Sequence, residues 1–184
     1  MANDKRIKVQ NDIISATIEC ISKNGIAGTT VRLIASNANV NTSAISYYFA
    51  SRDKLIGQAL KITLDNAFDL SDLNIDKKDS YKTVLKEVFL DWDSGAAAYP
   101  GICQAHFDEV LNNHIDSSVV SDRLNGFIKQ VFNLLIEHGL EDSIENFSKL
   151  KIAFGSFISS LIMPVVASPN IAKSEYIDLL VDMV

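Results

Sequence analysis

Three side chains that can bind metals or transfer protons lie close together in the sequence HFDEVLNNH. His106 and Glu109 are one helical turn apart, and His114 lies two turns beyond His106. Histidine and glutamate at such spacings hold metal ions in helical bundles. A di-iron bundle needs a second pair of this kind, and the sequence contains none. We therefore predict no metal site.

The cysteines are the next residues with chemical potential. Cys103 precedes His106 by three residues, which raises the alternative of a thiolate and imidazole pair in an all-α enzyme. A packed cysteine is the preferred interpretation, because both Cys103 and the distant Cys20 lie in amphipathic patterns. The sequence also contains no glycine-rich phosphate loop and no serine nucleophile elbow. We expect a protein that is not an enzyme and uses no cofactor.

The stretch NTSAISYYFASRDKL, residues 41–55, indicates another kind of chemistry. On a helix capped by Asn41 or Thr42, the apolar side chains face inward and a short polar and aromatic face points outward. The outward residues are Thr42, Ser43, Ser46 and Tyr47. Small hydroxyls and tyrosine allow a helix to approach a groove closely and to bond phosphates or base edges. This pattern is typical of a helix that contacts nucleic acid.

Two helices are expected before this one. Residues 6–23 carry isoleucines on one stripe, and a short helix follows Thr29 and Thr30, whose hydroxyls are good N-caps. Asn39 tolerates the left-handed conformation that a tight turn requires. Two short helices joined by such a turn form a helix-turn-helix, whose second helix enters the major groove of DNA. Ser51 is expected to cap a fourth helix.

The charge is distributed unevenly along the chain. Up to Leu55 there are seven basic and four acidic residues, so this segment carries +3, while the formal net charge of the whole chain is -6 and the remainder carries -9. A DNA phosphate backbone attracts local positive charge. We expect only the N-terminal segment to contact DNA.

Composition and hydrophobic periodicity predict an all-α fold. Apolar residues recur every three or four positions, and few prolines and glycines interrupt them. With the first three, we expect nine helices, the later ones over 52–70, 80–98, 102–113, 121–139, 143–166 and 171–184. The start MANDKRIKVQN has no apolar signal segment, and the apolar run over 152–167 is shorter than a membrane span. We expect a cytoplasmic protein.

The segment ISATIECISKNGIAGTTVRLIASNANVNTSAISYYFASRDKL resembles the TetR (tetracycline-repressor) family of bacterial transcription regulators. The resemblance lies in the first helix and its glycine, in the Thr29–Val31 start of the second helix, and in the aromatic pair before Phe49. It covers about a quarter of the chain. It implies a three-helix DNA-binding domain over residues 1–50 and a helical regulatory and dimerisation domain over residues 51–184.

Four residues depart from the family pattern. Asn39 stands where the family usually has glycine, Ser46 where many members have tyrosine, Tyr48 where histidine is frequent and Arg52 where lysine is usual. The resemblance implies that Arg32 and the outward face of the third helix read bases, while Thr30, Tyr48 and Arg52 hold the phosphate backbone. The predicted DNA contacts are Thr30, Arg32, Asn41, Thr42, Ser43, Ser46, Tyr47, Tyr48 and Arg52.

The resemblance also implies a small-molecule effector that binds the C-terminal domain and releases DNA. Such a pocket is apolar with a few polar groups. The aromatic residues predicted to line it are Phe89, Trp92, Tyr99, Phe107 and Phe132. Packing of the same residues in a plain hydrophobic core is the alternative.

The helix KLKIAFGSFISSLIMPVV is apolar around most of its circumference, and Gly155 and Ser159 allow a close helix approach. A core helix of a monomer is one interpretation; the family resemblance implies a homodimer in which the last two helices pair with their copies. The predicted interface residues are Phe154, Phe157, Ile158 and Leu161. We therefore expect a dimeric repressor of an inverted-repeat DNA site, with action through a protein partner as the alternative.

Overall fold

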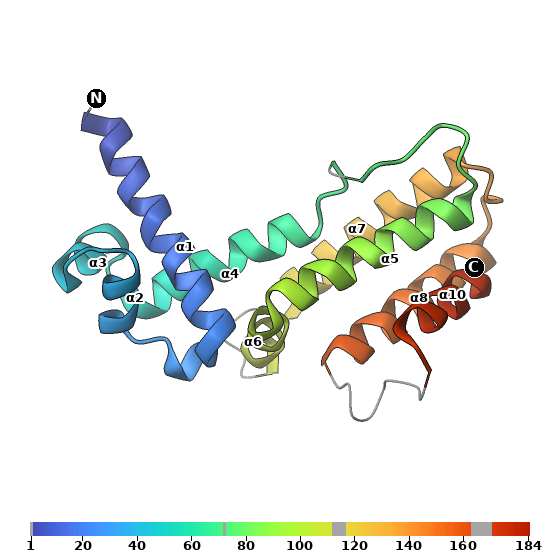
Figure 1. Cartoon of the computed structure of the whole chain (residues 1–184). Helices are drawn as coiled ribbons and strands as arrows, with labels where there is room; N and C mark the ends of the chain where they lie inside the picture. Colours follow the sequence, from blue (N-terminus) through green and yellow to red (C-terminus); the bar gives the residue numbers. More distant parts are fainter. Residues whose placement is uncertain (1, 72, 112–116, 163–170) are drawn as a thin grey trace. The chain divides into compact units, whose positions relative to one another are not determined.

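The protein is helical throughout the part that the computed structural model describes, which comprises residues 2–71, 73–111, 117–162 and 171–184. No strand occurs among these residues, so the all-α prediction is confirmed. The helices of the described part, nine as predicted, are α1 (Ala2–Gly28), α2 (Val31–Asn37), α3 (Thr42–Phe49), α4 (Arg52–Ala67), α5 (Tyr81–Ala98), α6 (Pro100–Leu111), α7 (Ser117–Glu137), α8 (Ile144–Ile162) and α10 (Lys173–Met183) (Figure 1). The predicted helix ends at residues 113 and 166 lie outside the described residues.

The chain forms two compact units. Unit 1 comprises Met1–Ala67 and Ala98–Leu111, and unit 2 comprises Phe68–Ala97 and Asn112–Val184. Unit 1 thus contains α1 to α4 together with α6. The predicted domain boundary after residue 50 concerns the division of function, and it remains a prediction.

Unit 1 has a core on each side of α1. Ile13 and Cys20 of α1 pack with buried side chains of α2, α3 and α4, and Ile21 packs with α4 and α6. The predicted stop at Gly25 is a kink with φ 65° and ψ 177°, after which the helix continues for one more turn. This conformation suits glycine because it has no Cβ. The first core fixes α2 and α3 against α1 and α4, and the second fixes α6 against the same two helices.

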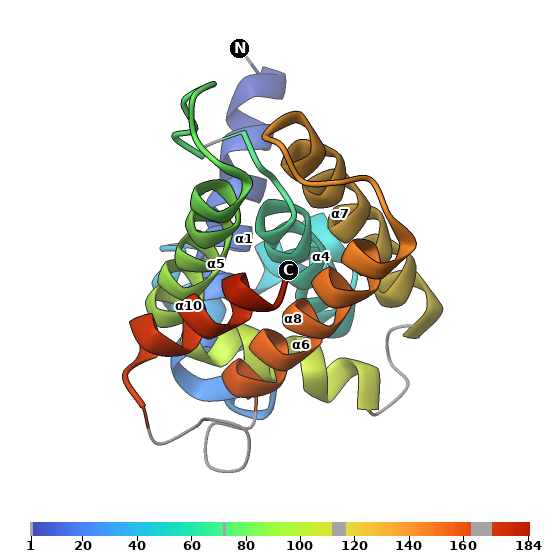
Figure 2. The same ribbon diagram turned by 90° about the vertical axis from the view of Figure 1, so that its right-hand side faces the viewer.

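Unit 2 is built around aromatic side chains from α5, α7 and α8. Trp92 stacks on Phe127 with ring centres 5.1 Å apart, and Phe89 contacts both Phe154 and Phe157. α10 lies beside α8 in both views of the molecule (Figures 1 and 2). Among the described helices, none is both long enough and apolar enough to span a membrane.

Candidate nucleic-acid interface

The start of α2 is fixed by the side chain that the sequence predicted. Thr30 is the N-cap, and its Oγ1 accepts a hydrogen bond of 3.2 Å from the amide of Leu33. Thr29 is instead buried, and its hydroxyl donates to the carbonyl of Gly25 at 2.7 Å. The two adjacent threonines therefore close α1 and open α2, and the Thr30 hydroxyl satisfies one of the free amides at the start of α2.

The turn between α2 and α3 has the predicted left-handed residue. Asn39 has φ 54°, and the amide of Val40 bonds to the carbonyl of Ala35 at 2.9 Å. α3 then begins with Asn41 as its N-cap, whose Oδ1 accepts from the amide of Ala44 at 2.9 Å and from the hydroxyl of Ser43 at 2.6 Å. The carboxamide of Asn41 thus holds both the first turn of α3 and a side chain on its outer face.

The two faces of α3 are those predicted from the sequence. Ile45 and Phe49 are buried in the core of unit 1. Thr42, Ser43 and Ser46 are exposed, and 73% of Tyr47 is accessible to solvent. Tyr47 therefore presents an exposed ring with a hydroxyl on a helix without acidic residues, and tyrosine of this kind is enriched at interfaces.

Tyr48 has a different environment from its neighbour. Its ring lies edge-on to that of Tyr47 at 4.9 Å and packs half-buried against the core of unit 1. This contact limits the rotation of the Tyr47 ring. Arg32 of α2 is exposed.

The guanidinium of Arg52 bonds to backbone carbonyls of the protein itself. Its Nε donates to the carbonyl of Thr29 at 2.7 Å, and its Nη2 donates to the carbonyl of Ile26. Its Nη1 pairs with Asp53 at 3.0 Å. Ser51 accepts a hydrogen bond from the amide of Lys54 at 3.2 Å, as expected of a cap of α4.

The residues predicted to line an effector pocket do not form one group. Phe89, Trp92 and Phe132 belong to the core of unit 2, whereas Tyr99 and Phe107 belong to unit 1. Phe89 is fully buried, and Tyr99 is half exposed. Their role in ligand binding stays a prediction.

The predicted interface helix presents another face than expected. Phe154 and Phe157 are fully buried in the core of unit 2, where they contact Phe89, and Leu161 packs against the same core. Ile158 is half-buried. The side of α8 available to a partner is therefore formed by other residues than Phe154 and Phe157.

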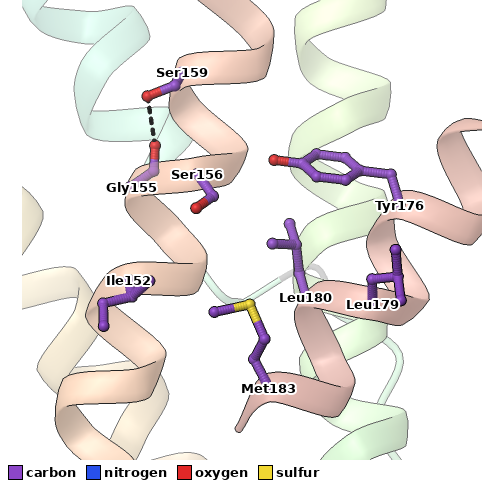
Figure 3. Close-up of a pocket in the computed structure, with 8 residues that line it drawn as sticks. All are labelled: Ile152, Gly155, Ser156, Ser159, Tyr176, Leu179, Leu180 and Met183. Atoms are coloured by element: carbon purple, nitrogen blue, oxygen red, sulfur yellow. Dashed lines mark hydrogen bonds between the residues drawn. The ribbon is translucent and has the colours of Figure 1, made fainter. Parts of the chain in front are cut away.

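That outer side of α8 forms a groove with α10. Ile152, Gly155, Ser156 and Ser159 of α8 face Tyr176, Leu179, Leu180 and Met183 of α10 around a volume of about 630 Å³ (Figure 3). The side chains of Ile152 and Leu179 remain 57% and 54% exposed. The spacing of residues 152, 155, 156 and 159 is a helical stripe that could have indicated this face. Sequence reasoning noted Gly155 and Ser159 on this face but named residues of the other stripe as the interface, because both stripes of α8 are apolar or small.

Cys103 and His106, the described residues first considered for catalysis, are half-buried. The hydroxyl of Thr63 donates to the carbonyl of Leu60, so His106 donates from Nε2 to Thr63 Oγ1 across 2.9 Å. Burial lowers the pKa of His106 to about 4 and raises the pKa of the Cys103 thiol. Among the described side chains, no three His, Cys, Asp or Glu are gathered to hold a metal. His114 and the side chain of Glu109 lie outside the described residues.

An all-α chain whose N-terminal unit presents the capped, exposed second helix of a helix-turn-helix is of the class of helix-turn-helix proteins. Residues 13–59 match the family model described as bacterial regulatory proteins, tetR family. These 47 residues are hence a TetR-family domain, and the predicted resemblance to the TetR family is confirmed over this segment.

Three similar proteins agree with this assignment. The Bacillus subtilis (strain 168) protein named "Probable HTH-type transcriptional regulator YttP" is 26% identical over 140 residues, which cover 73% of this chain and 66% of YttP, slightly less than two thirds of its length. A tetR-family transcriptional regulator from Streptomyces coelicolor has a TM-score of 0.75 at 14% identity, over 96% of this chain and 78% of that one. The multidrug binding protein EbrR, complexed with imidazole, has a TM-score of 0.54 at 21% identity, over 95% and 94% of the two chains. The two structures share the fold with this protein.

Proposed function

We propose that this protein is a transcription regulator that binds double-stranded DNA as a homodimer and is released from it by a small molecule. The observation that carries the proposal is the outer face of α3, which combines exposed hydroxyls with an exposed Tyr47 in a helix-turn-helix that matches the TetR family. Hydroxyls and an aromatic ring on a helix of this kind suit phosphates, base edges and thymine methyl groups.

Binding to DNA is also consistent with the charges on this unit. Arg32 and Lys54 are exposed, and α3 carries no acidic residue among Thr42–Phe49. Affinity should fall as salt rises, because each phosphate that is neutralised releases counterions. Of the predicted contacts, Asn41 and Thr30 have their side-chain oxygens engaged as helix caps. Their role at DNA would therefore be to orient α2 and α3.

The groove between α8 and α10 supports the proposed dimer. Ile152, Leu179 and Met183 are exposed apolar side chains on two adjacent helices, with Gly155 and Ser159 between them. An exposed apolar surface of this kind marks an interaction site, and a second copy can place the same face against it around a two-fold axis. The paired copies would carry two α3 helices, which fits an inverted-repeat DNA site.

A small-molecule effector is the least specified element of the proposal. Its support is the family and the multidrug binding protein EbrR, which has this fold. An effector that prefers the state unable to bind DNA would lower the affinity for DNA by the ratio of its affinities for the two states. We place the regulator in the cytoplasm. We assign it no enzymatic activity, because the Cys103 thiol, with its raised pKa, is a poor nucleophile and His106 is held by Thr63.

The proposal can be tested by selecting bound duplexes from a random DNA library at about physiological ionic strength. The wild type should enrich an inverted repeat, and Tyr47→Ala should not. Ile144→Ala is the matched control, because Ile144 is an exposed bulky residue of unit 2 that the proposal does not use. It should enrich the same repeat as the wild type. If the wild type enriches no sequence, the proposed function is wrong and a protein partner becomes the better explanation.

A further inference from the structure

The guanidinium of Arg52 is directed at the protein backbone. It lies at the first position of α4, yet Nε and Nη2 donate to the carbonyls of Thr29 and Ile26, which are 23 and 26 residues earlier in the chain. Nη1 is paired with Asp53, and 31% of the side chain is exposed. Three of its nitrogens therefore have partners within unit 1.

Of the two carbonyls that Arg52 binds, that of Ile26 belongs to the last turn of α1 and that of Thr29 directly follows this helix. The last carbonyls of a helix lack helical partners and carry partial negative charge, which basic residues in the last turn usually offset. α1 has no basic residue in its last turn. The amide and hydroxyl of Thr29 bond to Ile26 and Gly25, and Arg52 supplies the missing positive charge from α4.

The position of these bonds matters for α2 and α3. Thr29 directly precedes Thr30, the N-cap of α2. A bond from Arg52 to the Thr29 carbonyl therefore fixes the first residue of α4 to the peptide group before α2. Ile34 of α2, Phe49 of α3 and Leu55 of α4 also pack together as buried side chains in the core of unit 1. The helix-turn-helix is thus attached to α4 through its core and through this one guanidinium.

We propose that Arg52 is a positioning residue that clamps the junction of α1 and α2 to the start of α4, and so sets the orientation of α3, instead of holding a DNA phosphate. This inference rests on the proposed function only for its consequence at DNA. A lysine at this position would keep the charge, but it has no fork of N–H groups that can reach two carbonyls at fixed angles.

The clamp is tested first in the free protein, without DNA. Arg52→Lys and Arg52→Gln should both increase hydrogen exchange of the backbone amides over residues 26–34 and lower the Tm by about 5 °C. Lys54→Gln is the matched control, since Lys54 is an exposed cation two residues away and has no part in the clamp. It should leave exchange and Tm unchanged. Wild-type exchange in both Arg52 variants would overturn the clamp.

The second measurement is the affinity for the selected DNA as a function of salt. If Arg52 positions α3, Arg52→Lys should weaken binding at least tenfold, about the loss of one aligned base contact, with the salt slope unchanged. If Arg52 instead holds a phosphate, Arg52→Lys should bind normally and Arg52→Gln should reduce the slope by about 0.9. Faster exchange with normal affinity would also overturn the positioning role. A wild type that binds no DNA would refute the proposed function and with it the role at DNA, while hydrogen exchange would still report the clamp.

Discussion

The contact between α6 and α1 predicts that replacing a helical glycine with alanine lowers the stability of the protein, although alanine normally favours a helix. Gly101 is the second residue of α6, and a Cβ built on it would lie 2.8 Å from the carbonyl oxygen of Ile21 and still closer to that of Ser22. Both atoms belong to the backbone of α1, so no side-chain rotation can make room. The substitution Gly101→Ala should therefore push α6 away from α1 within unit 1.

The size of the effect follows from two opposing contributions. Alanine in place of glycine favours a helix by up to about 1 kcal/mol. Overpacking of a fixed core costs about 1–3 kcal/mol. Because the new methyl group meets the backbone oxygen of Ile21 at 2.8 Å and that of Ser22 at a still shorter distance, the cost should lie between about 2 and 3 kcal/mol. The net loss of stability should then be about 1–2 kcal/mol, or roughly 2–8 °C in Tm for a chain of this size. Gly126→Ala in α7 is the matched control, because nothing lies within 4 Å of the position that its new methyl group would take and the residue is exposed.

Two spectroscopic signals can locate the effect. Far-ultraviolet circular dichroism follows the helices of both units, whereas the fluorescence of Trp92, the sole tryptophan, follows the core of unit 2. In the unfolding curve recorded by circular dichroism, Gly101→Ala should move the midpoint to a lower urea concentration. Gly126→Ala should move it to a higher one, which corresponds to a gain of up to about 1 kcal/mol in the free energy of unfolding. If Gly101→Ala is as stable as the wild type, the close packing of α6 on α1 is refuted.

Three further predictions concern the cap, the buried histidine and the groove. Asn41→Ala should cost about 1 kcal/mol of stability, whereas Asn41→Ser should retain the cap, and equal losses in urea unfolding would contradict this role. Because the folded-state pKa of His106 is about 4, against about 6.5 when unfolded, stability should be constant above pH 7 and decrease by up to about 3 kcal/mol between pH 6.5 and 4. Unfolding at a series of pH values should show a shallower decrease for His106→Gln, and identical pH profiles would exclude the contribution. Leu179→Glu should give a monomer in sedimentation experiments with an unchanged circular dichroism spectrum, while Ile144→Glu, outside the groove, should leave the dimer intact; a dimeric Leu179→Glu would place the interface elsewhere.

The local features of unit 1 could be predicted from the sequence because each depends on residues close together in the chain. The faces of α3 follow from the spacing of Ile45 and Phe49, the turn from Asn39, and the caps from Thr30 and Asn41. Helix periodicity, left-handed conformations and caps all act within about four residues.

The role of Arg52 and the outer face of α8 could not be predicted in the same way. The carbonyls that Arg52 binds are more than twenty residues away, and nothing local shows that an arginine at the start of α4 reaches them. On α8, the stripe with Phe154 and Phe157 and the stripe with Ile152 are both suited to burial. Which one faces the core is decided by the aromatic side chains of α5 and α7, since only there do large rings find partners.

Positive φ angles at two residues that are not glycine, Asn39 and Ala50, lie on either side of α3. Such conformations end a helix abruptly, so α3 is confined to the eight residues Thr42–Phe49 and to a length of about 12 Å. Since successive base pairs are about 3.4 Å apart, one α3 can lie along only about three to four of them. A sequence of four base pairs recurs by chance about once in 256 positions, too often to mark a single promoter in a genome. Under the proposed function, the brevity of α3 therefore makes a second copy of the protein a requirement for finding a target.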